Sequence, residues 1–481
     1  MAQLFCIIQA ENKDIRLYPF SGGSFMEQMP KFDDNYTLFQ RTFLSAAAAV
    51  NDKNIISAVN VKYASNIKKQ LGKLKEKFCR NIEYKIISEP VSKNTAPLTA
   101  LAAKYINDNL IHYSNESPVI LTAPSNRIFP DREILASALE QGVKLAENGF
   151  IVSFGSKVSK INPDAAYFKA RKNASVTQLA PSALKVSEFI RNPAEKSEEE
   201  LKKFKLYADT GIYMFSFDTY MQELKKHAED IYSIIADKTV TDSIPSIAPA
   251  EYEKMPSVPI EDVIAADTKK LVMMPVNMDF KSVNSWDDVY EASDKDENGN
   301  CFSGRTVNME CADSLVYSKD KLTAVLGLKD MLVISSEDGS FICSRGKSGR
   351  IKEIYKKMTG RKAVLKDVNK TVYRPWGYYT VLENGEGFLT KCITVNPKSK
   401  LSLQRHFQRS EHWIILEGEA FVTKGQSSAV FKSGESVDIQ AQEIHSLENK
   451  GLEPLKIIEV QMGDVLDEND IERLDDIYGR V

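Results

Sequence analysis

The chain has 481 residues, of which 43% are hydrophobic and 27% charged, and its net charge is -3. Such a length predicts roughly two to four domains, because single cores rarely grow much further. The near-neutral balance gives no reason to expect nucleic acid or membrane partners. The six cysteines lack CxxC spacing and no secretory signal pattern precedes them, which predicts a cytoplasmic protein.

The first 290 or so residues alternate apolar runs with segments of helical periodicity. This alternation predicts an α/β fold with a mostly parallel sheet covered by helices. The expected strands are FCIIQA (5–10), YKIISEP (84–90), PVILTAPS (118–125) and FIVSFGS (150–156). The expected helices are TLFQRTFLSAAAAV (37–50), TAPLTALAAKYI (95–106) and EILASALEQGVKLAEN (133–148).

The remaining sequence changes character twice. Short strand-like pieces such as SLVYS and MLVISS predict a β module over 289–350, and a basic segment predicts a linker helix over 351–368. From 369 to 481, strand patterns separated by Gly, Pro and Asn turns favour a small antiparallel barrel or sandwich. The first domain then covers 1–288.

The last domain gathers residue types that bind metals. Gln404 and His406 are two apart, so on a strand their side chains point to the same side. With Glu411 and His445 they offer nitrogen and oxygen donors that suit Zn²⁺ and accept Mn²⁺, Co²⁺ or Fe²⁺. Polar residues also end barrel strands for structural reasons, so spacing alone leaves both interpretations open. Gly418 favours the metal site by providing a tight turn after the Glu411 strand.

The last domain contains four motifs, which are Arg374 to Gly377, Gln404 to Trp413, His445 with Leu447 to Asn449, and Tyr478 to Arg480. With these motifs, the region resembles the cupin domain of the bifunctional mannose-6-phosphate isomerase / mannose-1-phosphate guanylyltransferases. The chain departs from the family at Arg405, Phe407 and Gln408, of which the last two replace histidines. These departures leave open whether the cupin is active.

The resemblance implies a metal-dependent interconversion of mannose 6-phosphate and fructose 6-phosphate. A divalent metal, with Zn²⁺ expected first, would stabilise charge as a proton moves between C1 and C2. The phosphate needs cations, and we expect Arg409 and Lys391 to serve the reaction, with Arg374 and Arg480 binding substrate. His412 is expected to face away from the metal in a packing role, and packing is also expected of both Trp376 and Trp413.

The same family explains the N-terminal domain, where it carries a Rossmann-like, GT-A-like nucleotidyltransferase fold. The resemblance rests on EPVSKNTAP (89–97), Ala123-Pro124-Ser125, DTGIYMF (209–215) and a VNSW stretch ending at Trp286. The family's loop AGGSGTRLWPLS corresponds to Ala10 through Ser21, where every glycine is replaced. Glu11 and Asp14 now stand where a triphosphate would lie, and each like-charge contact costs roughly 1 to 4 kcal/mol.

Further family residues are replaced at positions that would serve phosphate or Mg²⁺. Lysines become Glu27 and Asn192, and aspartates become Asn126 and Ser282. The retained residues that could bind nucleotide weakly, or simply order loops, are Arg16, Glu89, Asn94 and Thr95, while Asp209 and Asp279 are candidate replacement carboxylates. We therefore expect an inactive nucleotidyltransferase domain serving as scaffold for a working isomerase.

Two other hypotheses stay open. In the first, the domain is an active Mg²⁺-dependent guanylyltransferase that makes GDP-mannose and pyrophosphate from GTP and mannose 1-phosphate. In the second, the chain is a non-catalytic regulatory protein that binds a sugar nucleotide. The resemblance places the chain near GDP-mannose and polysaccharide biosynthesis, with a sugar phosphate, or GTP or GDP-mannose, as ligand, and it permits a homodimer.

Overall fold

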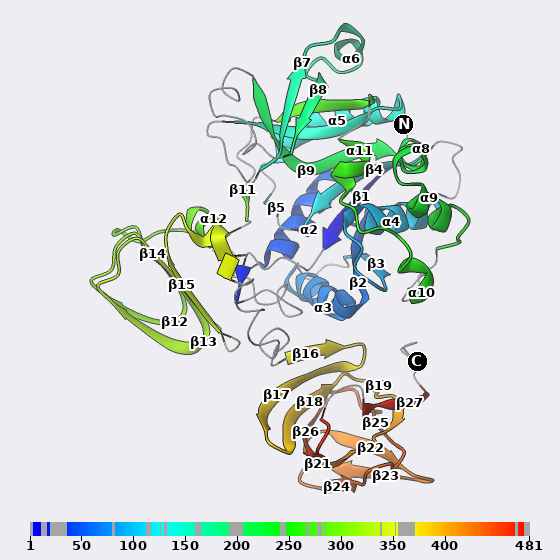
Figure 1. The fold of residues 1–481 in the computed structure, drawn as a ribbon, viewed down its shortest axis with the longest axis vertical. Helices are drawn as coiled ribbons and strands as arrows, with labels where there is room; N and C mark the ends of the chain where they lie inside the picture. Colours follow the sequence, from blue (N-terminus) through cyan, green and yellow to red (C-terminus); the bar gives the residue numbers. More distant parts are fainter. Residues whose placement is uncertain are drawn as a thin grey trace. The chain divides into compact units, whose positions relative to one another are not determined.

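The chain folds into two compact units, Met1–Lys356 and Lys357–Val481 (Figure 1). The computed structural model of the protein describes residues 3–10, 17–19, 36–78, 82–111, 117–125, 127–128, 132–158, 165–191, 205–240, 247–265, 269–276, 281–283, 285–336, 339–351, 353–354, 371–466 and 470–475. The loop at 11–16, with Arg16, lies outside this part, as do Glu27, Asn126, Asn192, Asp279, Arg480 and most of the expected linker helix.

The first unit contains a nine-stranded sheet in the order β3-β2-β1-β4-β9-β6-β10-β8-β7. Strands β3, β2, β1 and β4 pair in parallel, as do β6 and β10. Strands β7, β8 and β9 run antiparallel to their neighbours. The expectation of a mostly parallel sheet is therefore wrong for these strands, because antiparallel neighbours do not need the helical crossover that parallel neighbours require. The strands are β1 (Leu4–Ala10), β2 (Ile55–Asn60), β3 (Lys85–Glu89), β4 (Val119–Pro124), β6 (Ile151–Lys157), β7 (Tyr167–Arg171), β8 (Leu184–Ile190), β9 (Leu206–Ser216) and β10 (Leu271–Val276).

Helices cover both faces of this sheet. In β1, Phe5 and Ile7 join one buried cluster, while Cys6 and Ile8 join the other, as the two-residue period of a strand requires. The helices contributing to the first cluster are α4 (Thr95–Asn109), α8 (Phe217–His227), α9 (Glu229–Ala236), α10 (Pro249–Tyr252) and α11 (Ile260–Ile264). Those contributing to the second are α2 (Leu38–Ala49), α3 (Val61–Phe78), α5 (Arg132–Glu147) and α6 (Ala174–Leu179).

The expected β module follows the short helix α12 (Trp286–Ala292). Its four-stranded sheet pairs β12 (Cys301–Met309), β13 (Leu315–Leu326) and β14 (Met331–Ser335) in parallel, and adds β15 (Ser340–Ser344) antiparallel. The small elements of this unit are η2 (Asp52–Asn54), η4 (Ser348–Arg350) and a two-stranded pairing of β5 (Arg127–Ile128) with β11 (Lys281–Ser282). Trp286 anchors the module because its indole N–H donates to the carbonyl of Tyr18 at 2.9 Å.

The second unit is the expected antiparallel barrel, made of two sheets around a buried apolar core. One sheet has the order β16-β17-β18-β26-β21-β24, and the other runs β23-β22-β25-β20-β27 with β19 beside β25. The first contains β16 (Thr371–Arg374), β17 (Gly377–Gly385), β18 (Phe388–Val395), β26 (Leu455–Gly463), β21 (Arg409–Glu417) and β24 (Ser436–Ile439). The second contains β23 (Ser427–Lys432), β22 (Glu419–Lys424), β25 (His445–Asn449), β20 (Leu403–Arg405), β27 (Glu472–Asp475) and β19 (Ser399–Lys400).

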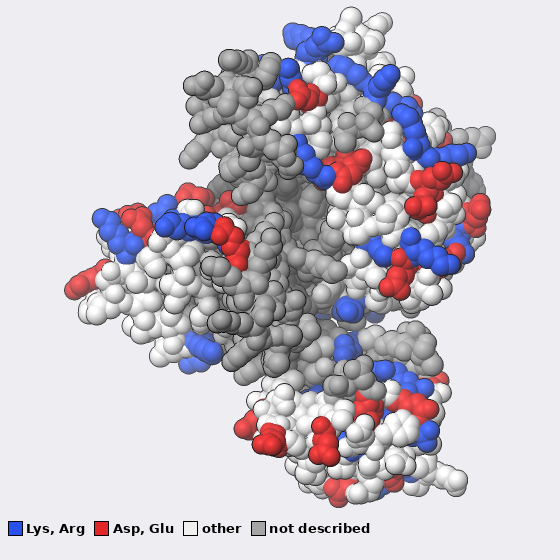
Figure 2. Space-filling model, in the orientation of Figure 1, with Lys and Arg blue, Asp and Glu red and all other residues white. Residues whose placement is uncertain are grey.

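Charged side chains of both signs are interspersed over the faces of both units that Figure 2 presents. Within the described residues, no helix is both long and apolar enough to cross a membrane.

Candidate active site in the barrel

Strand β21 brings its odd-numbered residues into the barrel. Arg409, Glu411 and Trp413 are buried, whereas Ser410 and His412 between them are partly exposed. The sequence pattern therefore directs three residues of different chemistry toward one interior. At the far end of the strand, Gly418 adopts φ +87°, which provides the expected tight turn into β22.

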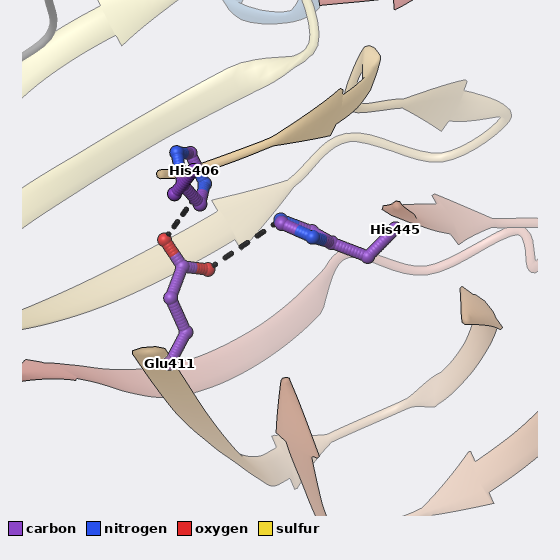
Figure 3. Close-up of side chains that lie close together, drawn as sticks. All are labelled: His406, Glu411 and His445. Carbon is purple, nitrogen blue, oxygen red and sulfur yellow. Dashed lines mark ion pairs between the residues drawn. The ribbon is translucent and has the colours of Figure 1, made fainter. Parts of the chain in front are cut away.

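Glu411 meets two histidines inside the barrel, as Figure 3 shows. Its Oε1 lies 3.0 Å from Nε2 of His406, and its Oε2 lies 3.8 Å from Nε2 of His445. The three residues come from β21, the turn after β20, and β25, and one ligand atom from each lies within 4.8 Å of the others. Gln404 is adjacent, with its Nε2 placed 3.4 Å from Nε2 of His406.

Both histidines are oriented for metal binding. Nδ1 of His406 lies 3.1 Å from the carbonyl oxygen of Asp470, and Nδ1 of His445 lies 2.8 Å from that of Glu443. A carbonyl only accepts, so each Nδ1 carries a hydrogen, and Nε2 of each imidazole, once neutral, is the atom left to bind a cation beside Glu411. Nε2 of His445 is buried without a hydrogen-bond partner. An orphaned buried acceptor beside a carboxylate and a second imidazole fits a divalent cation.

The electrostatics agree with a cation-binding centre. Burial acts to raise the pKa of Glu411, but the imidazoles of His406 and His445, when they are protonated, and the charge of Arg409 lower it on balance, so the carboxylate is ionised. Burial lowers the pKa of His445, with partial opposition from Glu411. The neutral imidazole that results is the form that binds metals.

Strand β26 adds two buried residues that sequence reasoning missed. Nε2 of Gln461 donates to Oε1 of Glu411 at 3.1 Å and to Oε1 of Glu459 at 2.8 Å. Burial first, and then the charge of Glu411, raise the pKa of Glu459 to about 8 despite the nearby Lys391. The signal was present in the sequence, because Glu459 and Gln461 are two apart on an obvious strand, as Gln404 and His406 are.

Three of the four predicted cations lie in the described part of this unit. Lys391 is buried, and its Nζ lies 3.6 Å from Oε1 of Glu459 and 4.7 Å from the ring centre of Tyr379. The guanidinium of Arg374 lies 5.6 Å from the same ring. Arg409 contacts two residues of the candidate metal site, with Nε 3.4 Å from Oε1 of Glu411 and Nη2 3.5 Å from Nε2 of His406.

The departures from the family motif fall outside this cluster. Phe407 and Gln408 are both exposed, whereas His406 beside them is 2% exposed. His412 faces away from Glu411, as expected, but its predicted packing role is wrong, because it is partly exposed and pairs with Asp438. Trp413 packs as expected and also orients the site by donating from Nε1 to Oε2 of Glu411 at 3.0 Å.

In the first unit, the described nucleotide-binding candidates make internal contacts. The carboxylate of Glu89 accepts from the Tyr252 hydroxyl at 2.9 Å, and the Asn94 side chain caps α4 by accepting from the N–H of Thr95 at 2.8 Å. The Thr95 hydroxyl oxygen accepts from the N–H of Ile260 at 2.8 Å. These contacts order the loop before α4.

Comparison with known proteins decides the family. Three family models cover most of the chain: nucleotidyl transferase over 13–294, the MannoseP isomerase/GMP-like beta-helix domain over 304–358, and mannose-6-phosphate isomerase C-terminal over 361–476. The chain belongs to the bifunctional mannose-1-phosphate guanylyltransferase / mannose-6-phosphate isomerase family. Its fold accordingly combines a nucleotidyltransferase domain with a C-terminal cupin, and the family suggests a divalent metal in that cupin.

Named relatives in this family match nearly the whole chain. The alginate biosynthesis protein AlgA of Pseudomonas putida is 30% identical over 98% of this chain and 96% of its own length. The mannose-1-phosphate guanylyltransferase RfbM of Salmonella typhimurium is 29% identical over 98% and 96%. A crystal structure titled mannose-1-phosphate geranyltransferase, from Thermus thermophilus, shares the fold at TM-score 0.59 and 17% identity, covering 74% of this chain and 99% of its own.

Proposed function

We propose that the chain acts in GDP-mannose formation, with guanylyl transfer in its first unit and metal-dependent isomerisation in its cupin. For the cupin, the observation that carries the proposal is the buried group of His406, Glu411 and His445, with ligand atoms within 4.8 Å of one another. For the first unit, support comes from relatives named as mannose-1-phosphate guanylyltransferases that align over nearly the full chain.

In the cupin, His406, Glu411 and His445 would hold the metal, and Gln404 would be the fourth protein ligand. A bound divalent cation would stabilise the negative charge that develops on O1 and O2 during isomerisation. Zn²⁺ is our first candidate, and Mn²⁺, Co²⁺ and Fe²⁺ suit the same nitrogen and oxygen donors.

The cations of this unit would bind and orient the sugar phosphate. Lys391 and Arg374 both lie against the ring of Tyr379, from neighbouring parts of one sheet. We assign the phosphate to these two residues, with Arg480 as a further candidate from the sequence. Arg409, in contact with Glu411 and His406, would instead act on the reacting end of the sugar.

The relatives favour an active transferase over the inactive scaffold expected from the loop. The family lysine that is replaced by Glu27 also has a substitute nearby in the sequence. Lys31 follows Pro30 directly, shortly after Glu27. Mg²⁺ would then be required, GTP and mannose 1-phosphate would be substrates, and Arg16, Glu89, Asn94 and Thr95 would lie along the nucleotide site.

Two assays on one preparation test the proposal. Pyrophosphate release should require GTP, mannose 1-phosphate and Mg²⁺, and conversion of mannose 6-phosphate to fructose 6-phosphate should require the cupin metal. His406→Ala should abolish only the second activity, which makes each assay the control for the other. If neither reaction occurs with any metal but GDP-mannose binds in calorimetry, the regulatory alternative replaces this proposal.

A further inference from the structure

The turn that carries His406 is held by a residue far away in the sequence. Residues 406–408 connect β20 to β21, and Asp470, which precedes β27, contacts this turn at several points. Its Oδ1 accepts from the N–H of Phe407 at 3.0 Å, and its Oδ2 accepts from the N–H of Gln408 at 3.2 Å. One carboxylate therefore fixes two successive peptide groups of the turn.

The main chain of Asp470 acts on the histidine directly. Its carbonyl oxygen lies 3.1 Å from Nδ1 of His406, across a sequence separation of 64 residues. The corresponding partner of His445 is the carbonyl of Glu443, only two residues away. The ring of His445 is thus oriented by a residue close to it in the sequence. The ring of His406 is oriented only when the segment that contains Asp470 packs against the turn at 406–408.

The charge of Asp470 also bears on the centre. The side chain of Asp470 is 2% exposed, and its Oδ2 lies 3.8 Å from Nη1 of Arg409. The same guanidinium lies 3.4 Å from Oε1 of Glu411. Asp470 and Glu411 therefore both attract the guanidinium of Arg409. Because Asp470 weakens the attraction between Arg409 and Glu411, the Glu411 carboxylate is more available to a metal.

We propose that Asp470 is a positioning residue for the cupin metal. It fixes the turn that carries His406, and it attracts Arg409 in competition with Glu411. This inference rests on the metal site of the proposed function. It gives Asp470 a role in metal affinity, although this residue would touch neither the metal nor the substrate. Partners that orient metal ligands typically change affinity by about 10 to 100-fold when removed.

The test measures Co²⁺ binding to the whole chain after its metal has been removed with a chelator. Visible absorption reports the bound Co²⁺, and a competing chelator sets the concentration of free Co²⁺. We expect Asp470→Ala to weaken Co²⁺ binding about 10 to 100-fold, with a changed absorption band, and Asp470→Asn to fall between Asp470→Ala and the wild type because it keeps one acceptor oxygen. Asp475→Ala is the matched control, since Asp475 lies on β27 and forms an ion pair with the partly exposed Lys400.

The Co²⁺ measurements distinguish a failure of the positioning role of Asp470 from a failure of the proposed metal site. Unchanged Co²⁺ affinity and absorption in Asp470→Ala, even with a lower melting temperature of the apo-protein, would overturn the positioning role. If Asp470→Ala does not fold, Asp470→Asn decides, and wild-type affinity in that variant overturns the proposal equally. A wild-type chain that binds no Co²⁺ contradicts the proposed metal site itself, and this inference with it.

Discussion

Nε2 of His406 lies 3.0 Å from Oε1 of Glu411, at a point where both side chains are almost completely buried. Glu411→Gln keeps the size of the side chain but removes the charge that would hold a cation. We expect metal affinity and isomerase turnover to fall by at least about 100-fold, while pyrophosphate release from GTP stays unchanged. Metal content and both rates, measured on one preparation, check this prediction. Full metal occupancy in the variant would contradict it.

The exposed position of Gln408 predicts that its difference from the family is harmless. Gln408→His should change metal affinity and mannose 6-phosphate turnover by less than about twofold, as surface substitutions usually do. Phe407→His should behave in the same way. A gain of tenfold or more in either rate would instead assign a reaction role to the missing histidine.

Lys391 should matter for the substrate rather than for the metal. A charge-assisted hydrogen bond contributes about 1.5 to 3 kcal/mol, so Lys391→Met should raise the KM for mannose 6-phosphate roughly 10 to 150-fold and leave Zn²⁺ affinity within a few-fold. Lys400→Met, at a more exposed lysine of the same unit, is the control. A variant with normal KM would remove Lys391 from the phosphate site.

Glu459 predicts a pH dependence of apo-protein stability. Its pKa is raised to about 8 in the fold, so the folded state binds the proton more tightly than the unfolded state does. The stabilisation is complete below the ordinary pKa of a glutamate and is lost as pH rises through about 8. Between pH 7 and 8, the unfolding free energy should fall by up to about 1.4 kcal/mol per pH unit, and this slope should disappear in Glu459→Gln. Urea unfolding of chelated protein measures it, and equal slopes would contradict the assignment.

The acidic first loop predicts a slow transferase that charge removal accelerates. If Asp14 faces a triphosphate, Asp14→Gly removes roughly 1 to 4 kcal/mol of repulsion and should lower the KM for GTP at least about fivefold. Asp52→Gly, on the short helix η2, is a charge-matched control. Pyrophosphate release at varied GTP measures both variants. An unchanged KM in Asp14→Gly would place this carboxylate away from the phosphates.

The sequence predicts the parts of this fold that a short-range pattern specifies. The apolar run FCIIQA and the helical periodicity of TAPLTALAAKYI correspond to β1 and α4, and the strand patterns after 369 correspond to the antiparallel barrel. The direction of strand pairing is not local information. For this reason the antiparallel partners of β9 could not be predicted from the sequence pattern.

In the candidate site, too, a short-range sequence pattern predicts some residues, and the fold alone brings the others together. Gln404, His406, Glu411 and His445 were accessible because two-residue spacing and donor chemistry are readable along the chain. Glu459 and Gln461 carry the same spacing, but no loop or motif drew attention to them. Asp470 could not be found from a pattern, because its contacts with His406 and Arg409 depend on how the terminal segment returns to β20.

The most direct test of the cupin assignment is the mannose 6-phosphate isomerase rate of chelator-stripped protein during titration with Zn²⁺. We expect negligible turnover without metal, saturation at one equivalent per chain, and no restored turnover in His445→Ala. Full turnover of the stripped protein in the presence of chelator would contradict the central claim that His406, Glu411 and His445 hold a metal that the reaction needs.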